Sequence, residues 1–67
     1  MKKLIFDSMP DLKKMMDIFE KNNLEYSWHF LNKRYEIHLG DTNPDHVRLI
    51  LKNIGNTIPF KWADYYW

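Results

Sequence analysis

Two histidines and a glutamate, His29, Glu36 and His38, are the side chains of this sequence best suited to chemistry. Two imidazoles and a carboxylate can hold a divalent transition metal when they converge on one point. A flat strand surface positions such ligands poorly, because no surrounding groups fix their orientation. We therefore expect no metal and no cofactor, and interpret His29 and Glu36 as a cross-strand pair on a solvated sheet surface.

The remaining residue types favour no enzyme mechanism. Ser8 and Ser27 belong to no recognisable nucleophile–base motif, and the isolated Gly40 and Gly55 cannot form a phosphate-binding loop. The cysteine count is zero, so neither a disulfide nor a thiolate metal site can form. A chain of 67 residues also leaves little room for paired carboxylates in an enclosed cleft. We expect no catalytic residues and no enzymatic activity.

A β-hairpin is the strongest structural pattern in the sequence. Apolar and polar residues alternate over residues 24–30 and again over residues 35–39, with Asn32 and Lys33 between them. If Asn32 and Lys33 form a two-residue turn, apolar side chains meet across the hairpin, and a slip of one residue would lose that match. The predicted pairs are Phe30–Tyr35, Trp28–Ile37 and Tyr26–Leu39 on one face, and His29–Glu36 and Ser27–His38 on the other.

Two amphipathic helices are predicted, one on each side of the hairpin. Ser8 has the position of an N-cap and Pro10 fits the first helical turn, while Thr42 or Asn43 can cap the second helix. Gly55 has the position of the residue that ends the second helix. Apolar residues at helical spacing are Leu12, Met15, Met16 and Phe19 in the first helix, and Val47, Ile50, Leu51 and Ile54 in the second.

The outer strands have weaker signals. Residues 4–6 form a short apolar run that predicts a first strand, and Ile58, Phe60 and Trp62 alternate with polar residues or proline in a last one. Because Pro59 cannot donate a ladder hydrogen bond, the last strand should be short or lie at a sheet edge.

These elements predict a single α+β domain over residues 1–67. The order β-α-β-β-α-β favours a two-layer ferredoxin-like sandwich, in which an antiparallel sheet carries two helices on one face. The alternative is a three-stranded β-α-β-β-α sheet with an aromatic C-terminal tail. In both, the hairpin aromatics should lie on the face that the helices cover. The open sheet face should carry Glu25, His29, Arg34, Glu36 and His38.

Composition favours a cytoplasmic protein with no membrane association. The apolar run that follows Lys2 and Lys3 is too short for a signal peptide, and no stretch approaches the roughly 20 apolar residues that span a bilayer. A single alanine among many Lys, Asn and Ile residues is typical of an A+T-rich genome, such as that of a low-GC bacterium or one of its phages.

Nucleic-acid binding is the alternative function. Its candidate residues are Lys13, Lys14, Lys33 and Arg34, all in the Lys-rich first half of the chain. The net charge of +1 gives this function little support, because dedicated nucleic-acid binders usually carry a clear basic excess. Glu25 and Glu36 on the open face would also repel phosphate, and RNA-binding domains of this architecture need aromatic rings there.

Protein binding is the function that the sequence favours. Trp62, Tyr65, Tyr66 and Trp67 provide more aromatic surface than one edge strand can bury, and such residues often dominate interface energetics. We expect a small non-catalytic module that modulates or inhibits a larger protein. Its size and composition fit a phage or mobile-element accessory protein that acts on a host enzyme or defence complex. A homodimer would use the same aromatic residues and the open sheet edges.

Overall fold

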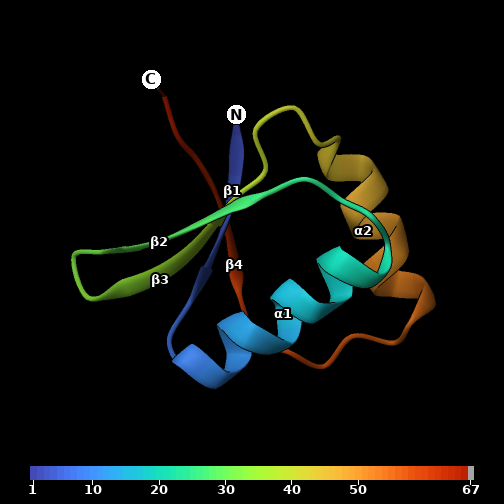
Figure 1. The fold of residues 1–67 in the computed structure, drawn as a ribbon, viewed down its shortest axis with the longest axis horizontal. Helices are drawn as coiled ribbons and strands as arrows, with labels where there is room; N and C mark the ends of the chain where they lie inside the picture. Colours follow the sequence, from blue (N-terminus) through green and yellow to red (C-terminus); the bar gives the residue numbers. More distant parts are fainter. Residues whose placement is uncertain (67) are drawn as a thin grey trace.

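Six elements follow one another in the order β-α-β-β-α-β in the computed structural model, which describes residues 1–66 (Figure 1). The elements are β1 (Lys2–Phe6), α1 (Met9–Lys21), β2 (Ser27–Leu31), β3 (Arg34–His38), α2 (Pro44–Asn53) and β4 (Lys61–Asp64). The strands form one sheet of order β2-β3-β1-β4 in which all neighbours are antiparallel. This α+β arrangement confirms the predicted ferredoxin-like fold and rules against the three-stranded alternative.

Both helices pack on the same face of the sheet. Leu4 lies opposite Ile37 in the β1–β3 pairing, so their side chains share a face, and both are completely buried. The apolar stripes of α1 and α2 close this core from the other side. The buried core residues are Leu4, Phe6, Ile37 and Leu39 from the sheet and its exit, and Leu12, Met15, Phe19, Val47 and Leu51 from the helices.

Local capping sets where the helices begin and end. The side chain of Ser8 accepts a hydrogen bond from the N–H of Asp11 at 3.4 Å, and Asn43, one of the two predicted caps, accepts one from Asp45 at 2.9 Å. Asn23, with φ of +55°, terminates the first helix in the left-handed region. Neither helix of the described chain combines the length and apolar character needed to cross a membrane.

The hairpin has the predicted register. Trp28 lies opposite Ile37 and Phe30 opposite Tyr35, and the turn residues Asn32 and Lys33 both have positive φ, as a two-residue hairpin of the favoured handedness requires. Their burial differs from the prediction, however. Trp28 and Phe30 are about half exposed, because β2 is an edge strand and the hairpin extends beyond the helical layer (Figure 1).

The last strand lies at the predicted edge but begins later than the alternation suggested. β4 has four residues and starts after Pro59, which has no N–H to donate to a ladder. Trp62 lies opposite Leu4 and therefore directs its side chain at the helical face, where Phe60 also packs against the core. The predicted alternation of Phe60 and Trp62 thus identifies the correct face.

Replacement of Lys33 by glycine tests the hairpin turn. Lys33 has a φ of +62°, which costs a residue with a Cβ about 1–2 kcal/mol. We expect Lys33→Gly to raise the free energy of unfolding by about 0.5–1 kcal/mol, after allowance for the greater backbone entropy of glycine. Urea denaturation measures the change. Lys33→Ala is the matched control, since it removes the charge but keeps the strain, and an equal gain in both variants would contradict this account.

Candidate functional site

The open face of the sheet holds a buried polar cluster made of Lys3, Glu36 and His38. β1 and β3 pair side by side and bring the three side chains together. The Lys3 ammonium donates to the two carboxylate oxygens of Glu36 at 3.0 and 3.2 Å, and Nε2 of His38 lies 2.8 Å from Glu36 Oε1. Because an ionised carboxylate only accepts hydrogen bonds, Nε2 of His38 carries the proton in this contact.

Burial and charge oppose each other at Glu36. The residue is only 3% exposed and His38 only 6%, so the expectation of a solvated surface is wrong for both. Burial alone would raise the pKa of Glu36, but the hydrogen bonds from His38 and Lys3, together with their charges, outweigh it and hold the pKa below the ordinary value. The cluster therefore keeps a carboxylate ionised in a nearly dry position.

Aromatic rings cover this cluster. The His38 ring packs against those of His29 and Tyr65, with centroid distances of 4.2 and 4.3 Å, and the Tyr65 ring stacks on it at an angle of 30°. Tyr65 is fixed at two further points: its hydroxyl accepts from the N–H of Gly40 at 3.0 Å, and its own N–H donates to the carbonyl of Met1 at 2.9 Å. The segment after β4 is therefore tied to the open face.

The side chains of His29, Glu36 and His38 are not arranged as a metal site would require. His29 and Glu36 are opposite in register, as predicted, but Glu36 bonds Lys3 and His38, while His29 Nε2 lies 3.1 Å from Ser27 Oγ. Within residues 1–66 no group of three His, Asp or Glu side chains is arranged to hold a metal ion. The carboxylate oxygens of Glu36 stabilise a fixed ion cluster in this arrangement.

Glu25 and Arg34, the other residues expected on the open face, are exposed near opposite ends of the hairpin. Glu25 precedes β2, and its carbonyl accepts a hydrogen bond from the Thr42 hydroxyl at 2.6 Å. An open pocket beside Tyr65 has Glu25 and Asp41 in its lining. Two carboxylates make this pocket unfavourable for an anionic ligand.

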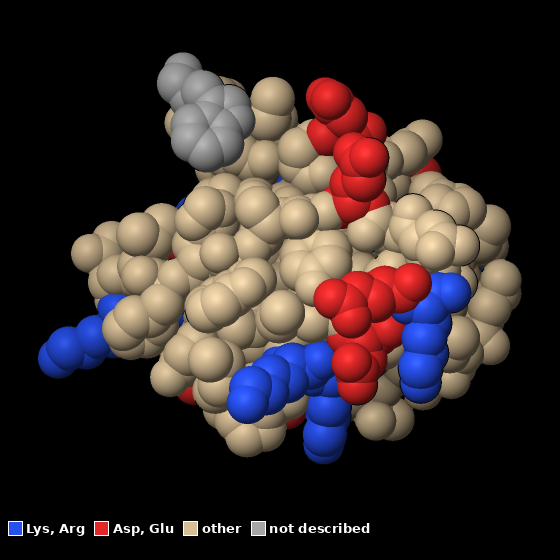
Figure 2. Space-filling view, viewed as in Figure 1, with Lys and Arg blue, Asp and Glu red and all other residues tan. Residues whose placement is uncertain are grey.

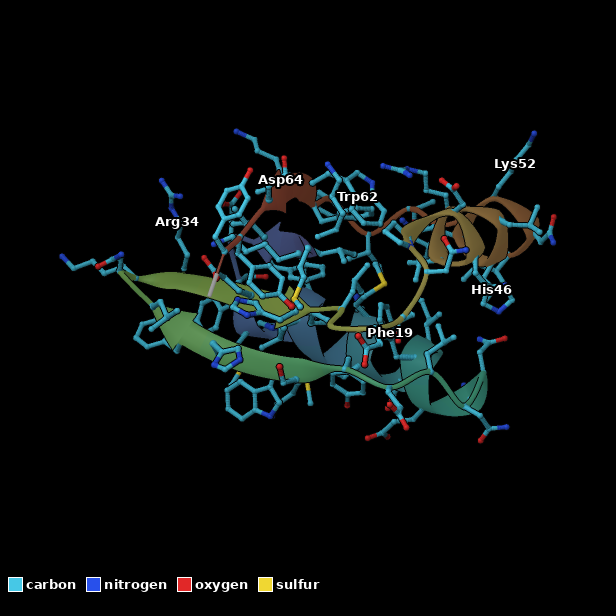
Figure 3. The ribbon with its side chains drawn as sticks, turned by 90° about the horizontal axis from the view of Figure 1, so that it is seen from above. Phe19, Arg34, His46, Lys52, Trp62 and Asp64 are labelled. Carbon is cyan, nitrogen blue, oxygen red and sulfur yellow. The ribbon has the colours of Figure 1, made fainter. Side chains whose placement is uncertain are left out.

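The candidate nucleic-acid residues lie on separate elements. Lys13 and Lys14 are on α1, whereas Lys33 and Arg34 form the outer end of the hairpin, and all four are exposed. Figure 3 shows Arg34 at one end of the molecule and Lys52 at the other. A short nucleic acid would have to bridge these elements to contact all four.

The C-terminal aromatics have unequal roles. Trp62 is partly buried beside α2, with the Arg48 guanidinium 4.5 Å from its ring centroid (Figure 3), and Tyr65 is buried on the open face. Tyr66, the next residue, is 88% exposed. Trp67 lies outside the described residues. Of the four residues predicted to bind protein, Tyr66 is therefore the one seen with its ring free for contact.

The predictions from sequence did not include the exposed apolar residues of β2. Trp28, Phe30 and Leu31 are 47%, 56% and 48% exposed. Trp28 and Phe30 share one face of the strand, and we call these two residues the β2 surface. Figure 2 shows few charged side chains over the hairpin except at its tip. Lys, Arg, Asp and Glu side chains gather over the rest of the face that is drawn. The signal in the sequence was that β2 carries no Lys, Arg, Asp or Glu.

No protein-family model, curated protein or solved structure matches this chain.

The free energy of unfolding should depend on the ionisation of Glu36 when the pH falls below the ordinary pKa of glutamate, 4.5. Because folding lowers the pKa of Glu36, its contribution is fully present above that value and is lost as the pH falls through the lower pKa of the folded state. We expect Glu36→Gln to lower the free energy of unfolding by about 1–3 kcal/mol at neutral pH. On acidification the variant should lose less stability than the wild type, because it has no carboxylate at this position to protonate.

Urea denaturation of both proteins between about pH 6 and about pH 3 measures this difference. Asp64→Asn is the matched control. The pKa of Asp64 is also lowered by its hydrogen bond to Lys2, at 2.7 Å, but the pair is exposed and should contribute little. Equal pH profiles for wild type and Glu36→Gln would contradict the assignment.

Proposed function

We propose that this protein is a small non-catalytic module that binds a larger protein and modulates or inhibits it. The observation that carries the proposal is the exposed ring of Tyr66 next to the immobilised Tyr65. The contacts of Tyr65 fix the backbone that leads into Tyr66, which limits the backbone ordering needed on binding, and Tyr is among the residues that most often dominate interface energetics. The exposed Met1 side chain lies on the neighbouring segment and adds apolar contact area.

The polar cluster supports a structural role for the open face. Both carboxylate oxygens of Glu36 accept hydrogen bonds from Lys3, and one of them also contacts His38. A general base must reach a substrate proton, and the buried Glu36 instead bonds to its neighbours. This arrangement favours a non-catalytic module, with no cofactor in its mechanism.

Nucleic-acid binding receives less support from the same face. RNA-binding domains of this architecture stack bases on aromatic rings that stand open on the sheet. Here Tyr65 and His38 are stacked on each other and buried, so their faces are already in contact. The acidic Glu25 and Asp41 beside them would repel a phosphate backbone.

The biological setting that we propose follows from size and composition. A chain of 67 residues with no cysteine, one alanine and many Lys, Asn and Ile fits a cytoplasmic accessory protein of a phage or mobile element. Its target would be a host enzyme or defence complex, which it would block or modulate by contact with Tyr66 and the residues around it.

Substitution of Tyr66 tests the proposed function. The tagged wild-type chain should capture one stoichiometric protein from a low-GC bacterial host, and Tyr66→Ala should weaken that complex by about tenfold or more, because anchor rings typically contribute 2 kcal/mol or more. Affinity capture, followed by titration with the purified partner, measures the loss.

Leu49→Ala is the matched control, since Leu49 is also an exposed apolar residue but lies on α2. Circular dichroism must show that both variants are folded. Unchanged affinity of folded Tyr66→Ala would refute the role of this surface. Binding to RNA or DNA that weakens steeply with salt would favour the alternative function.

A further inference from the structure

The β2 edge differs from the β4 edge in its protection against pairing. β4 follows Pro59, has four residues and carries the charged Lys61 and Asp64, all features that discourage strand addition. β2 is the opposite edge of the sheet, and its five residues include no proline and no Lys, Arg, Asp or Glu. Such an unprotected edge is a template for another strand.

The backbone of β2 is oriented for this pairing. In a two-residue hairpin the pair beside the turn, Leu31–Arg34, is the hydrogen-bonded one, and bonded and non-bonded pairs alternate from there. Trp28 and Phe30 therefore direct their N–H and C=O groups away from β3, toward the open edge. The same two residues hold their rings about half exposed.

We propose that a second copy of this chain covers the edge, with the two β2 strands antiparallel about a twofold axis at His29. This register places Trp28 opposite Phe30 of the second copy, twice, and both residues have outward backbone groups. Each contact is a cross-strand aromatic pair, the kind that stabilises antiparallel sheets. The two four-stranded sheets would then form one continuous sheet across the axis.

Charge at the ends of β2 selects this orientation. Glu25 precedes the strand and Lys33 follows it in the turn, and both are exposed. In the proposed register Glu25 of one copy lies at the same end of the interface as the turn that carries Lys33 of the other copy, and the same holds at the second end. A parallel arrangement would place like charges together. A second copy is therefore an occupant whose charges complement those of the edge.

The available area is compatible with a reversible dimer. The β2 surface of two copies exposes roughly 500 Å² of large side chains, if half of each aromatic residue is counted as accessible. This is less than half of the roughly 1,200 Å² that the smallest stable interfaces bury, so the paired backbone must supply much of the contact and the dimer should be weak. We expect a dissociation constant in the micromolar range, so the chain should be monomeric when dilute and dimeric when concentrated.

Charge reversal tests both the occupant and the orientation. Glu25→Lys and Lys33→Glu should each weaken self-association about tenfold, because two attractive contacts become repulsive. An equimolar mixture of the two variants should recover a dimer, since each contact then joins opposite charges. Sedimentation velocity between about 1 µM and about 1 mM measures all three samples. Within one copy the two residues lie at opposite ends of β2, so the recovery requires two chains.

Phe30→Lys should abolish the dimer, while Leu49→Lys, which adds the same charge at a similarly exposed position on α2, should preserve it. Circular dichroism checks that both variants are folded. The proposal is overturned if the wild-type chain is monomeric at about 1 mM, or if it self-associates without recovery in the mixed variants. Neither result bears on capture of a larger partner through Tyr66, so the two proposals fail separately.

Discussion

The size of the helical layer is the constraint from which the rest of this structure follows. Two short helices, of 13 and 10 residues, bury the apolar residues of the central strands β1 and β3 on one face of the sheet. They leave β2 half exposed and the opposite face uncovered. Among residues 1–66 no helix packs on that face, and the side chains of Lys3 and Tyr65 cover part of it instead.

The cover of the open face combines ionic and aromatic contacts. Glu36 remains ionised because Lys3 and His38 surround it, and removal of one partner from such a buried cluster leaves an uncompensated charge. The Tyr65 ring stacks on His38 and covers this side of the cluster. The hydroxyl and backbone contacts of Tyr65 fix the backbone that leads into the exposed Tyr66.

Local patterns predicted the elements better than their burial. The caps at Ser8 and Asn43 and the hairpin register depend on residues close in sequence, and the structure confirms them. The cluster around Glu36 depends on Lys3, which the sheet pairing brings beside it, and on Tyr65, which stacks on His38; both lie far from Glu36 in the chain. The exposure of Trp28 depends on how far the helices extend over the hairpin, which an alternating pattern does not specify.

The exposed aromatic residues Tyr66 and Phe30 lie on two different segments of the chain. Tyr66 extends from a segment tied to Met1 and Gly40, whereas Phe30 lies on β2, which pairs only with β3 in the described sheet. A dimer paired through β2 would carry two copies of Tyr66. A twofold dimer would present two identical binding surfaces on one rigid sheet. Against an oligomeric target, the second contact becomes intramolecular, and avidity rises without any additional interaction in either site.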